Sequence, residues 1–350
     1  MFSSRQVLGA ADTPPVDTLL PAPGYRAERP TRGDLEAIGE ILVACDVDEV
    51  GEPDFLDAQW LEEEWDGFPV NLATDAWIVR RTDGPVAAYV HVAEEIPGRV
   101  WEAVGWVHPT QRNKGLGSFL VQATEQDVFR KLTDGGSIQL HHIVMGVNGA
   151  GRDLMSRAGF EATRHFWHME IDLEAPRPRP HLSPGISIAP LHLERDEPDI
   201  HRVLEVSFAQ HWGFASTPYE KWLDESVRKP WFDAALSFVA RSEGEAVGAL
   251  VGRVDHGRGF VDDLGVLKEQ RGRGIGAALL DTAFAAFEQR GLARARLNVD
   301  AGNETGAVRL YERVGMRMVR SWIVFAKEIT AAGGRRATVA QAQPRGEGRI

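Results

Sequence analysis

The sequence contains one glycine motif twice, and this repeat constrains the fold more than any other feature. Residues 106–117 read WVHPTQRNKGLG, and residues 265–276 read GVLKEQRGRGIG. In both copies an arginine lies three positions before Gly-x-Gly, and these arginines, Arg112 and Arg271, are 159 residues apart. Because this offset is about the length of one domain, the sequence predicts two similar domains in tandem.

A second repeated segment follows each glycine motif. LMSRAGF at 154–160 matches LYERVGM at 310–316, in the same order and at nearly the same offset. Between the halves, residues 175–185 contain four prolines, which cannot continue a helix or a central strand and therefore predict an extended linker. We expect an N-terminal domain over residues 25–174 and a C-terminal domain over residues 186–330.

Composition narrows the class of protein. The chain has 350 residues, of which 43% are hydrophobic and 26% are charged, and these proportions are typical of a soluble globular protein. A net charge of −12 disfavours sequence-independent binding to nucleic acid. The single cysteine, Cys45, excludes an internal disulfide and a multi-cysteine metal site. We therefore expect no bound metal and no nucleic-acid partner.

The two ends of the chain have little apolar pattern. We expect residues 1–24 to form a flexible leader and residues 331–350 to form a disordered tail. The chain contains no apolar run long enough to span a membrane, and its beginning has no apolar core of the kind found in signal peptides. These features predict a cytoplasmic protein with no membrane partner, either a monomer or a homodimer.

Each glycine motif joins an expected strand to an expected helix. Residues 259–266 have the composition of a short strand, and residues 277–290 have the apolar spacing of an amphipathic helix. The first N–H groups of a helix lack partners and carry partial positive charge, so the motif suits an anion such as a phosphate. It fits neither the P-loop nor the dinucleotide-binding pattern. The strands and helices in each half predict an α/β fold.

With these motifs, each half resembles a domain of the GCN5-related N-acetyltransferase (GNAT) family. The resemblance covers roughly residues 25–328. The family's acyl-CoA signature is Arg/Gln-x-x-Gly-x-Gly/Ala, and it is met by Arg271, Gly274 and Gly276 and by Arg112, Gly115 and Gly117. The resemblance implies a splayed mixed sheet that holds acetyl-CoA, the acyl donor, in its gap. It also implies direct transfer of the acetyl group to an amine.

The expected cofactor contacts follow from the glycines and from the resemblance. The backbone of residues 272–276 can donate several N–H groups to a diphosphate, and Arg273 either adds a phosphate contact or stays solvated. The resemblance implies that main-chain N–H groups of the preceding strand bind the thioester oxygen, and that Asn303 caps a helix or bonds the pantetheine arm. The full set is Leu264, Val266, Arg271, Gly272, Arg273, Gly274, Ile275, Gly276 and Asn303, with Val107, Arg112, Gly115 and Gly117 in the first half.

Tyr311 is the candidate general acid. Asn303, Ala307, Tyr311 and Gly315 lie at four-residue steps, as in the family pattern whose tyrosine is often the acid. A phenol with an ordinary pKa of about 10 is suited to reprotonating the departing thiolate. The alternative is a tyrosine that only packs on the sheet.

Asp262 and Asp263 are the candidate bases. Adjacent residues of a strand point to opposite faces, so one of these two acids must face the cleft or lose its solvation. A carboxylate there accepts the ammonium proton through water or holds the cation. The alternative is that one acid bonds neighbouring loops as scaffold.

The two halves differ at these positions. Aligning them places Ala103 and Val104 against the two aspartates and Met155 against Tyr311. We therefore expect catalysis in the C-terminal domain, and an N-terminal domain that binds acetyl-CoA without turnover or whose pocket stays empty.

The acceptor site is expected after the first helix of the C-terminal half, where His211, Trp212 and Phe214 occur. These residues either form its wall or pack between the domains. The leading hypothesis is an acetyl-CoA-dependent N-acetyltransferase for a small primary amine. The alternatives are an acyl-CoA sensor without turnover and a protein N-acetyltransferase.

Overall fold

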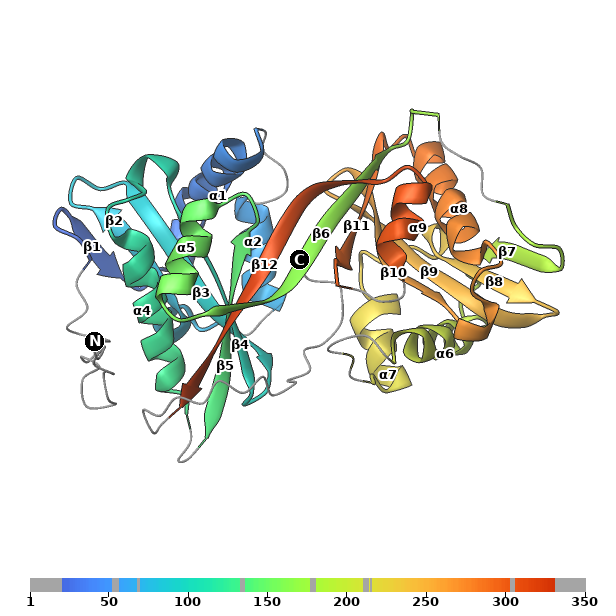
Figure 1. Ribbon diagram of the computed structural model, residues 1–350, viewed down its shortest axis with the longest axis horizontal. Helices are drawn as coiled ribbons and strands as arrows, with labels where there is room; N and C mark the ends of the chain where they lie inside the picture. The colour runs from blue at the N-terminus through green and yellow to red at the C-terminus, as the bar shows by residue number, and fades with distance from the viewer. Residues whose placement is uncertain are drawn as a thin grey trace, which may run out of the picture. The chain divides into compact units, whose positions relative to one another are not determined.

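The chain forms two compact units in the computed structural model (Figure 1). Unit 1 contains the described residues up to Thr163 and those from Ile323 onward, and unit 2 contains Arg164–Trp322. The structure describes residues 21–51, 57–67, 70–132, 136–176, 181–209, 214, 216–302 and 306–330. No helix within these ranges is long and apolar enough to cross a membrane.

Unit 1 is built on a mixed sheet in which antiparallel pairs are followed by one parallel pair, β4 with β5. Its strands are β1 (Tyr25–Glu28), β2 (Ala76–Arg81), β3 (Val86–Ile96), β4 (Val100–Val107) and β5 (Ser137–Met145). Its helices are α1 (Leu35–Val50), α2 (Ala58–Gly67), α3 (Leu72–Asp75), α4 (Leu116–Phe129) and α5 (Gly149–Arg157), with the 3-10 turns η2 (Arg32–Asp34) and η3 (Pro109–Gln111).

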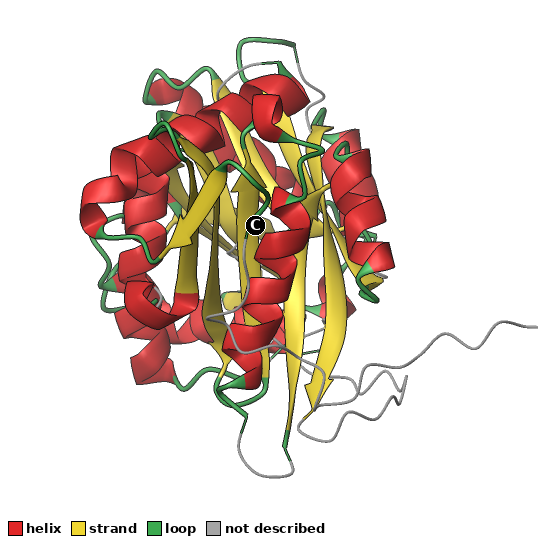
Figure 2. Cartoon of the chain, turned by 90° about the vertical axis from the view of Figure 1, so that its left-hand side faces the viewer, coloured by secondary structure: helices red, strands yellow, loops and turns green. Residues whose placement is uncertain are grey.

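Helices cover both faces of this sheet (Figure 2). Successive side chains of a strand point to opposite faces. Ile78 of β2 packs in an apolar cluster with Ile38 of α1 and Leu61 of α2, whereas its neighbour Val79 packs in another with Leu120 of α4. The sheet is therefore buried on both sides, and the strand residues are apolar at consecutive positions.

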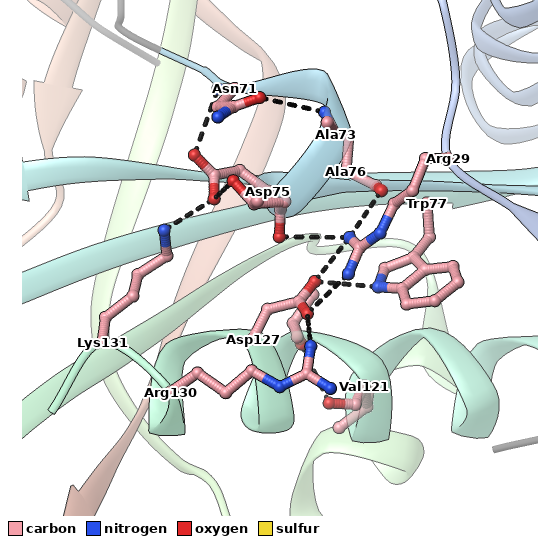
Figure 3. A network of polar contacts seen from close by, with 12 residues as sticks. Arg29, Asn71, Ala73, Asp75, Ala76, Trp77, Val121, Asp127, Arg130 and Lys131 are labelled. Carbon is pink, nitrogen blue, oxygen red and sulfur yellow. Dashed lines mark hydrogen bonds and ion pairs between the residues drawn. The ribbon is translucent and has the colours of Figure 1, made fainter. Parts of the chain in front are cut away.

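A polar network ties α4 to the edge of the sheet in unit 1 (Figure 3). Arg29 donates hydrogen bonds of 2.8 Å to both carboxylate oxygens of Asp127, and the Nε1 of Trp77 donates a third. The guanidinium of Arg29 also lies 3.7 Å from the ring centroid of Trp77. Because the buried carboxylate has charge-assisted partners on both oxygens, it stabilises the fold.

Unit 2 has a mixed sheet of the same kind, in which β10 pairs in parallel with β11 and the other pairs are antiparallel. Its strands are β6 (Glu161–Asp172, from Arg164), β7 (Ile186–Pro190), β8 (Phe238–Ser242), β9 (Glu245–Asp255), β10 (Arg258–Val266) and β11 (Arg294–Asp300). Its helices are α6 (Glu197–Phe208), α7 (Tyr219–Trp222), α8 (Ile275–Gln289) and α9 (Ala307–Arg313), with the π-helical turn η4 (Leu223–Val227) and the 3-10 turns η5 (Ala234–Leu236) and η6 (Lys268–Gln270). The predicted α/β fold with a mixed sheet is confirmed in both units.

Each unit is completed by a segment from the other half of the sequence. Strand β6 leaves unit 1 after Thr163 and pairs with β11 in unit 2. Strand β12 (Arg317–Thr330) leaves unit 2 after Trp322, and its residues Phe325 and Ile329 join the core of unit 1. The repeat does not predict this exchange, because strand pairing is a long-range property.

Candidate active site

A cavity of about 540 Å³ lies in unit 2 where strands β10 and β11 part. The parallel pairing ends at Val261 and Leu297, and the next residues of both strands, Leu264 and Val266 on one side and Asn298 on the other, line the cavity. Because β11 does not pair with this end of β10, the strand edge there is open to a ligand.

The second glycine turn forms one end of this cavity. Gly272 and Gly274 have φ angles of 79° and 81°, in the left-handed region that favours glycine. Gly274 is the N-cap of α8, whose first residues Ile275 and Gly276 also line the cavity. The first N–H groups of α8 have no partner within the helix, so the turn presents donors and a positive dipole end to an anion.

The end of the linker lies against this turn. The N–H of Ser183 donates to the carbonyl of Arg273 at 3.2 Å, and both His181 and Ser183 line the cavity. A Cβ atom at Gly274 would clash with the carbonyl oxygen of His181. Gly274 is thus required both by its φ angle and by this close approach of the backbone. The sequence predicted the glycine but not the approach of His181.

The two arginines of the second turn have different surroundings. Arg271 is exposed, and its Nε donates to the carbonyl of Val266 at 3.1 Å. Arg273 is half-buried, and its guanidinium bonds the side chains of Gln270 and Ser242. Both arginines line the cavity, so they add positive charge beside the helix N-terminus.

A β-bulge turns Asp262 toward the cavity. Val261 pairs with Gly252 of β9 and Asp263 pairs with Val251, so Asp262 has no partner opposite it. Asp262 lines the cavity, whereas Asp263 is not among its described lining residues. The bulge explains why simple alternation along the strand does not decide which aspartate faces inward.

The surroundings of the Asp262 carboxyl favour neither a fully charged nor a fully neutral group at neutral pH. Its Oδ2 is buried and has no hydrogen-bond partner within the described residues, and its Oδ1 lies 3.4 Å from the Nε of Arg253. Burial raises the pKa of Asp262 to about 7, with Arg253 opposing the rise and Asp263 and Asp255 adding to it. A carboxyl with this pKa exchanges a proton at neutral pH.

Tyr311 lies on α9 and lines the same cavity. Its side chain is buried, and it also belongs to the apolar core cluster of unit 2. The packing fixes the position of the ring, and the role of Tyr311 as general acid stays a prediction. Asn303, His211 and Trp212 lie outside the described residues, and the half-buried Phe214 is not among the described residues that line this cavity.

Asn298 is a polar lining residue that sequence reasoning missed. Its Oδ1 lies 2.6 Å from the Nδ1 of His168, the residue opposite it on β6. The contact joins two strands that lie far apart in the sequence, so no local pattern could indicate it. Within the described residues, no group of three or more His, Cys, Asp or Glu side chains could hold a metal ion.

The first glycine turn has the same backbone shape but a different charge arrangement. Gly115 has a φ of 83° and is the N-cap of α4, and Gly117 is on the first turn of that helix. Arg112 is paired with Asp48 at 2.5 Å and with Glu49 at 3.0 Å. The Val107 carbonyl lies 3.4 Å from the thiol of Cys45. The arginine of this turn is therefore already neutralised by α1.

Strands β10 and β11 part beside a cavity, and a glycine turn leads into the next helix at its end. This arrangement defines an α/β domain whose open sheet edge suits an anionic ligand. The chain belongs to the acetyltransferase (GNAT) family, which matches residues 35–160 and 200–316. The predicted family is thus confirmed in both halves. The protein is an acetyl-CoA-dependent N-acetyltransferase, with acetyl-CoA as the acyl donor.

Its relatives include enzymes of one named activity. Mycothiol acetyltransferase of Thermobispora bispora is 34% identical over 216 residues, which are 60% of this chain and 70% of that protein. Mycothiol acetyltransferase of Amycolatopsis mediterranei is 29% identical over 294 residues, which are 80% of this chain and 91% of that protein.

Two solved structures have a similar fold. A GCN5-related N-acetyltransferase from Sphaerobacter thermophilus matches with a TM-score of 0.78 and 31% identity, covering 89% of this chain and 98% of that one. A tandem GNAT protein from the clavulanic acid biosynthesis pathway matches with a TM-score of 0.61 and 14% identity, covering 89% of this chain and 99% of that one. This second likeness concerns the fold alone.

Proposed function

We propose that the protein acetylates the primary amine of a small molecule by direct attack on acetyl-CoA, with catalysis in unit 2. The observation that carries the proposal is that the second glycine turn, Asp262 and Tyr311 line one and the same cavity. The similarity to mycothiol acetyltransferases supports a small-molecule acceptor.

The open edge of β10 supports a role for Val266 in binding the thioester oxygen. The N–H of Leu267 donates to the carbonyl of Val247 on β9 at 3.0 Å. Because backbone groups alternate in direction along a strand, the N–H of Val266 points the other way, toward the gap left by β11. An N–H there suits the oxyanion that forms as the amine attacks.

In the proposed reaction the neutral amine attacks the thioester carbonyl carbon, forming the C–N bond. The Val266 N–H stabilises the oxyanion, and the C–S bond then breaks. The ammonium proton passes to the Asp262 carboxylate, directly or through water, and the Tyr311 hydroxyl protonates the coenzyme A thiolate. The diphosphate binds at the turn formed by residues 272–276.

The test is a thiol-release assay with purified protein, acetyl-CoA and a panel of primary amines, with the products identified by mass spectrometry. We expect release with at least one small amine and an acetylated product of that amine. Release with peptides alone would indicate a protein N-acetyltransferase. Tight acetyl-CoA binding without release would indicate a sensor.

Several properties of the whole chain stay predictions from the sequence. Unit 1 is expected either to bind acetyl-CoA without turnover or to have a pocket that stays empty. A cytoplasmic location and a monomeric or homodimeric state rest on the sequence alone. The domain boundaries at residues 174 and 186 likewise stay predictions.

A further inference from the structure

Arg253 lies in strand β9, outside every motif of the sequence. Its guanidinium carbon is 4.9 Å from the ring centroid of Phe260, the residue opposite it on β10, and 5.2 Å from that of Trp231. Its side chain is 20% exposed. Two aromatic rings therefore hold this charge in place by cation–π contacts.

The two carboxylates nearest to this guanidinium lie at longer distances than a close ion pair would have. Its Nε is 3.4 Å from Asp262 Oδ1, and its Nη2 is 3.7 Å from Asp255 Oδ1. The Nε of Arg253 and the Oδ2 of Asp262 are buried, and neither has a hydrogen-bond partner within the described residues. The positive charge of Arg253 therefore stabilises the Asp262 carboxylate through its proximity, without a hydrogen bond from its Nε.

Unit 1 also contains an arginine that lies over an aromatic ring beside an aspartate, with shorter contacts to the carboxylate. Arg29 lies over Trp77 and donates to both oxygens of Asp127 at 2.8 Å (Figure 3). A bidentate pair of that kind occupies both oxygens of the carboxylate with strong hydrogen bonds. The longer contact between Arg253 and Asp262 leaves the Oδ2 of Asp262 without a hydrogen-bond donor among the described residues, so no existing bond has to break when this carboxylate takes up a proton.

We propose that Arg253 is a positioning residue for Asp262, holding its carboxylate beside the cavity and favouring its ionised form. This inference rests on the proposed function of Asp262 as the base. The charged groups that act on Asp262 are Arg253 and Asp255 from β9 and Asp263 from β10 itself. Since the other two are acids, Arg253 is the one that favours the carboxylate.

The experiment follows the Asp262 carboxyl directly by carbon NMR of protein labelled at aspartate side-chain carboxyls. The signal is assigned by its loss in Asp262→Asn, and its titration is compared between wild type and Arg253→Gln. We expect the midpoint to move upward by roughly 1 to 3 pH units, because an opposite charge within a few ångströms lowers a carboxyl pKa by about that much. Arg253→Lys should restore much of the difference.

Two further variants keep the result decisive. Arg253→Met, whose side chain still fits between the two rings, supplies the same comparison if the glutamine variant does not fold. Arg81→Gln removes an arginine from a surface ion pair of unit 1 and should leave the midpoint unchanged. An Asp262 midpoint that stays at the wild-type value in a folded Arg253→Gln or Arg253→Met protein would overturn the proposal.

The titration separates this inference from the proposed function, because it needs no acceptor. With the best amine of the panel, the pH at which kcat/KM rises should move upward in Arg253→Gln by the same amount as the NMR midpoint. A shifted NMR midpoint with an unshifted rate profile would retain Arg253 as the residue that sets Asp262 ionisation but remove Asp262 as the base. An unshifted NMR midpoint would contradict the role of Arg253 whatever the rate shows.

Discussion

The two glycine turns share a backbone but differ in what surrounds them. Gly115 and Gly274 have φ angles of 83° and 81°, and each is the N-cap of the helix that follows. Arg112 is held by Asp48 and Glu49 of α1, whereas the exposed Arg271 donates to the backbone carbonyl of Val266. The turn alone therefore specifies a helix start, and the charges beside it decide whether an anion is favoured.

The strands before the turns differ as well. In β4, Ala103 and Val104 pair in continuous register with Val92 and His91 of β3. In β10 the register shifts at the corresponding place, and Asp262 occupies the bulge. An acid and an irregular backbone therefore occur together in unit 2, and neither occurs at the matching position of unit 1.

We expect the greatest loss of activity from a substitution that places a side chain in the second glycine turn. Gly274→Val adds a Cβ that clashes with the His181 carbonyl and strains a left-handed φ, so acetyl-CoA turnover should fall to background. Gly115→Val strains an equivalent φ without any atom within 4 Å of the new Cβ, and should change turnover by only a few-fold. Rates from thiol release and binding from calorimetry check this pair. Equal losses in both variants would contradict the assignment of catalysis to unit 2.

Removing the candidate base should have the next largest effect. Asp262→Asn should lower kcat by roughly 10² to 10⁴, the usual contribution of general acid–base catalysis. In wild type the deprotonated carboxylate is the active form, so kcat/KM should rise as the pH is raised through about 7. The asparagine variant should lose this rise. Asp263→Asn is the matched control, and an equal loss there would point to the wrong acid.

Tyr311→Phe should lower kcat by roughly tenfold to a hundredfold while leaving the affinity for acetyl-CoA nearly unchanged, because only the proton donor is removed. Tyr25→Phe, which removes a hydroxyl bonded to Gln111 in unit 1, serves as the control. Steady-state rates and acetyl-CoA titrations give the two numbers. A Tyr311→Phe enzyme with wild-type kcat would leave this tyrosine with its packing role only.

The sequence predicted those parts of the site that depend on local chemistry. Gly274 was identified from a motif, and Tyr311 from four-residue spacing, because a helix places such residues on one face. The aspartates remained undecided because a bulge shifts the alternation of a strand, and no local pattern announces it. Arg253, Asn298 and the approach of His181 to the turn depend on contacts between distant segments, which no short window contains.

The pH dependence of the free energy of unfolding should also reveal the raised pKa of Asp262. A pKa raised to about 7 means that the folded state binds a proton the unfolded state releases above about 4. Wild type should therefore lose stability as the pH rises from about 4 to 7, by on the order of 1 kcal/mol per pH unit, and Asp262→Asn should not. Thermal unfolding at several pH values measures the difference. A constant gap between the two proteins across that range would contradict the raised pKa.

Substitutions of the two signature arginines should have the smallest effects, and the effects should differ in kind between the two units. Arg271→Gln should raise the KM for acetyl-CoA by roughly three- to tenfold, since an exposed charge contributes modestly. Arg112→Gln should leave that KM unchanged but lower the free energy of unfolding by about 1 to 3 kcal/mol, because it removes the charge that neutralises the half-buried Glu49. The same substitution thus acts on binding in one half and on folding in the other. If Arg112→Gln instead changed the KM and left stability intact, the ion pairs seen in unit 1 would have to open when acetyl-CoA binds.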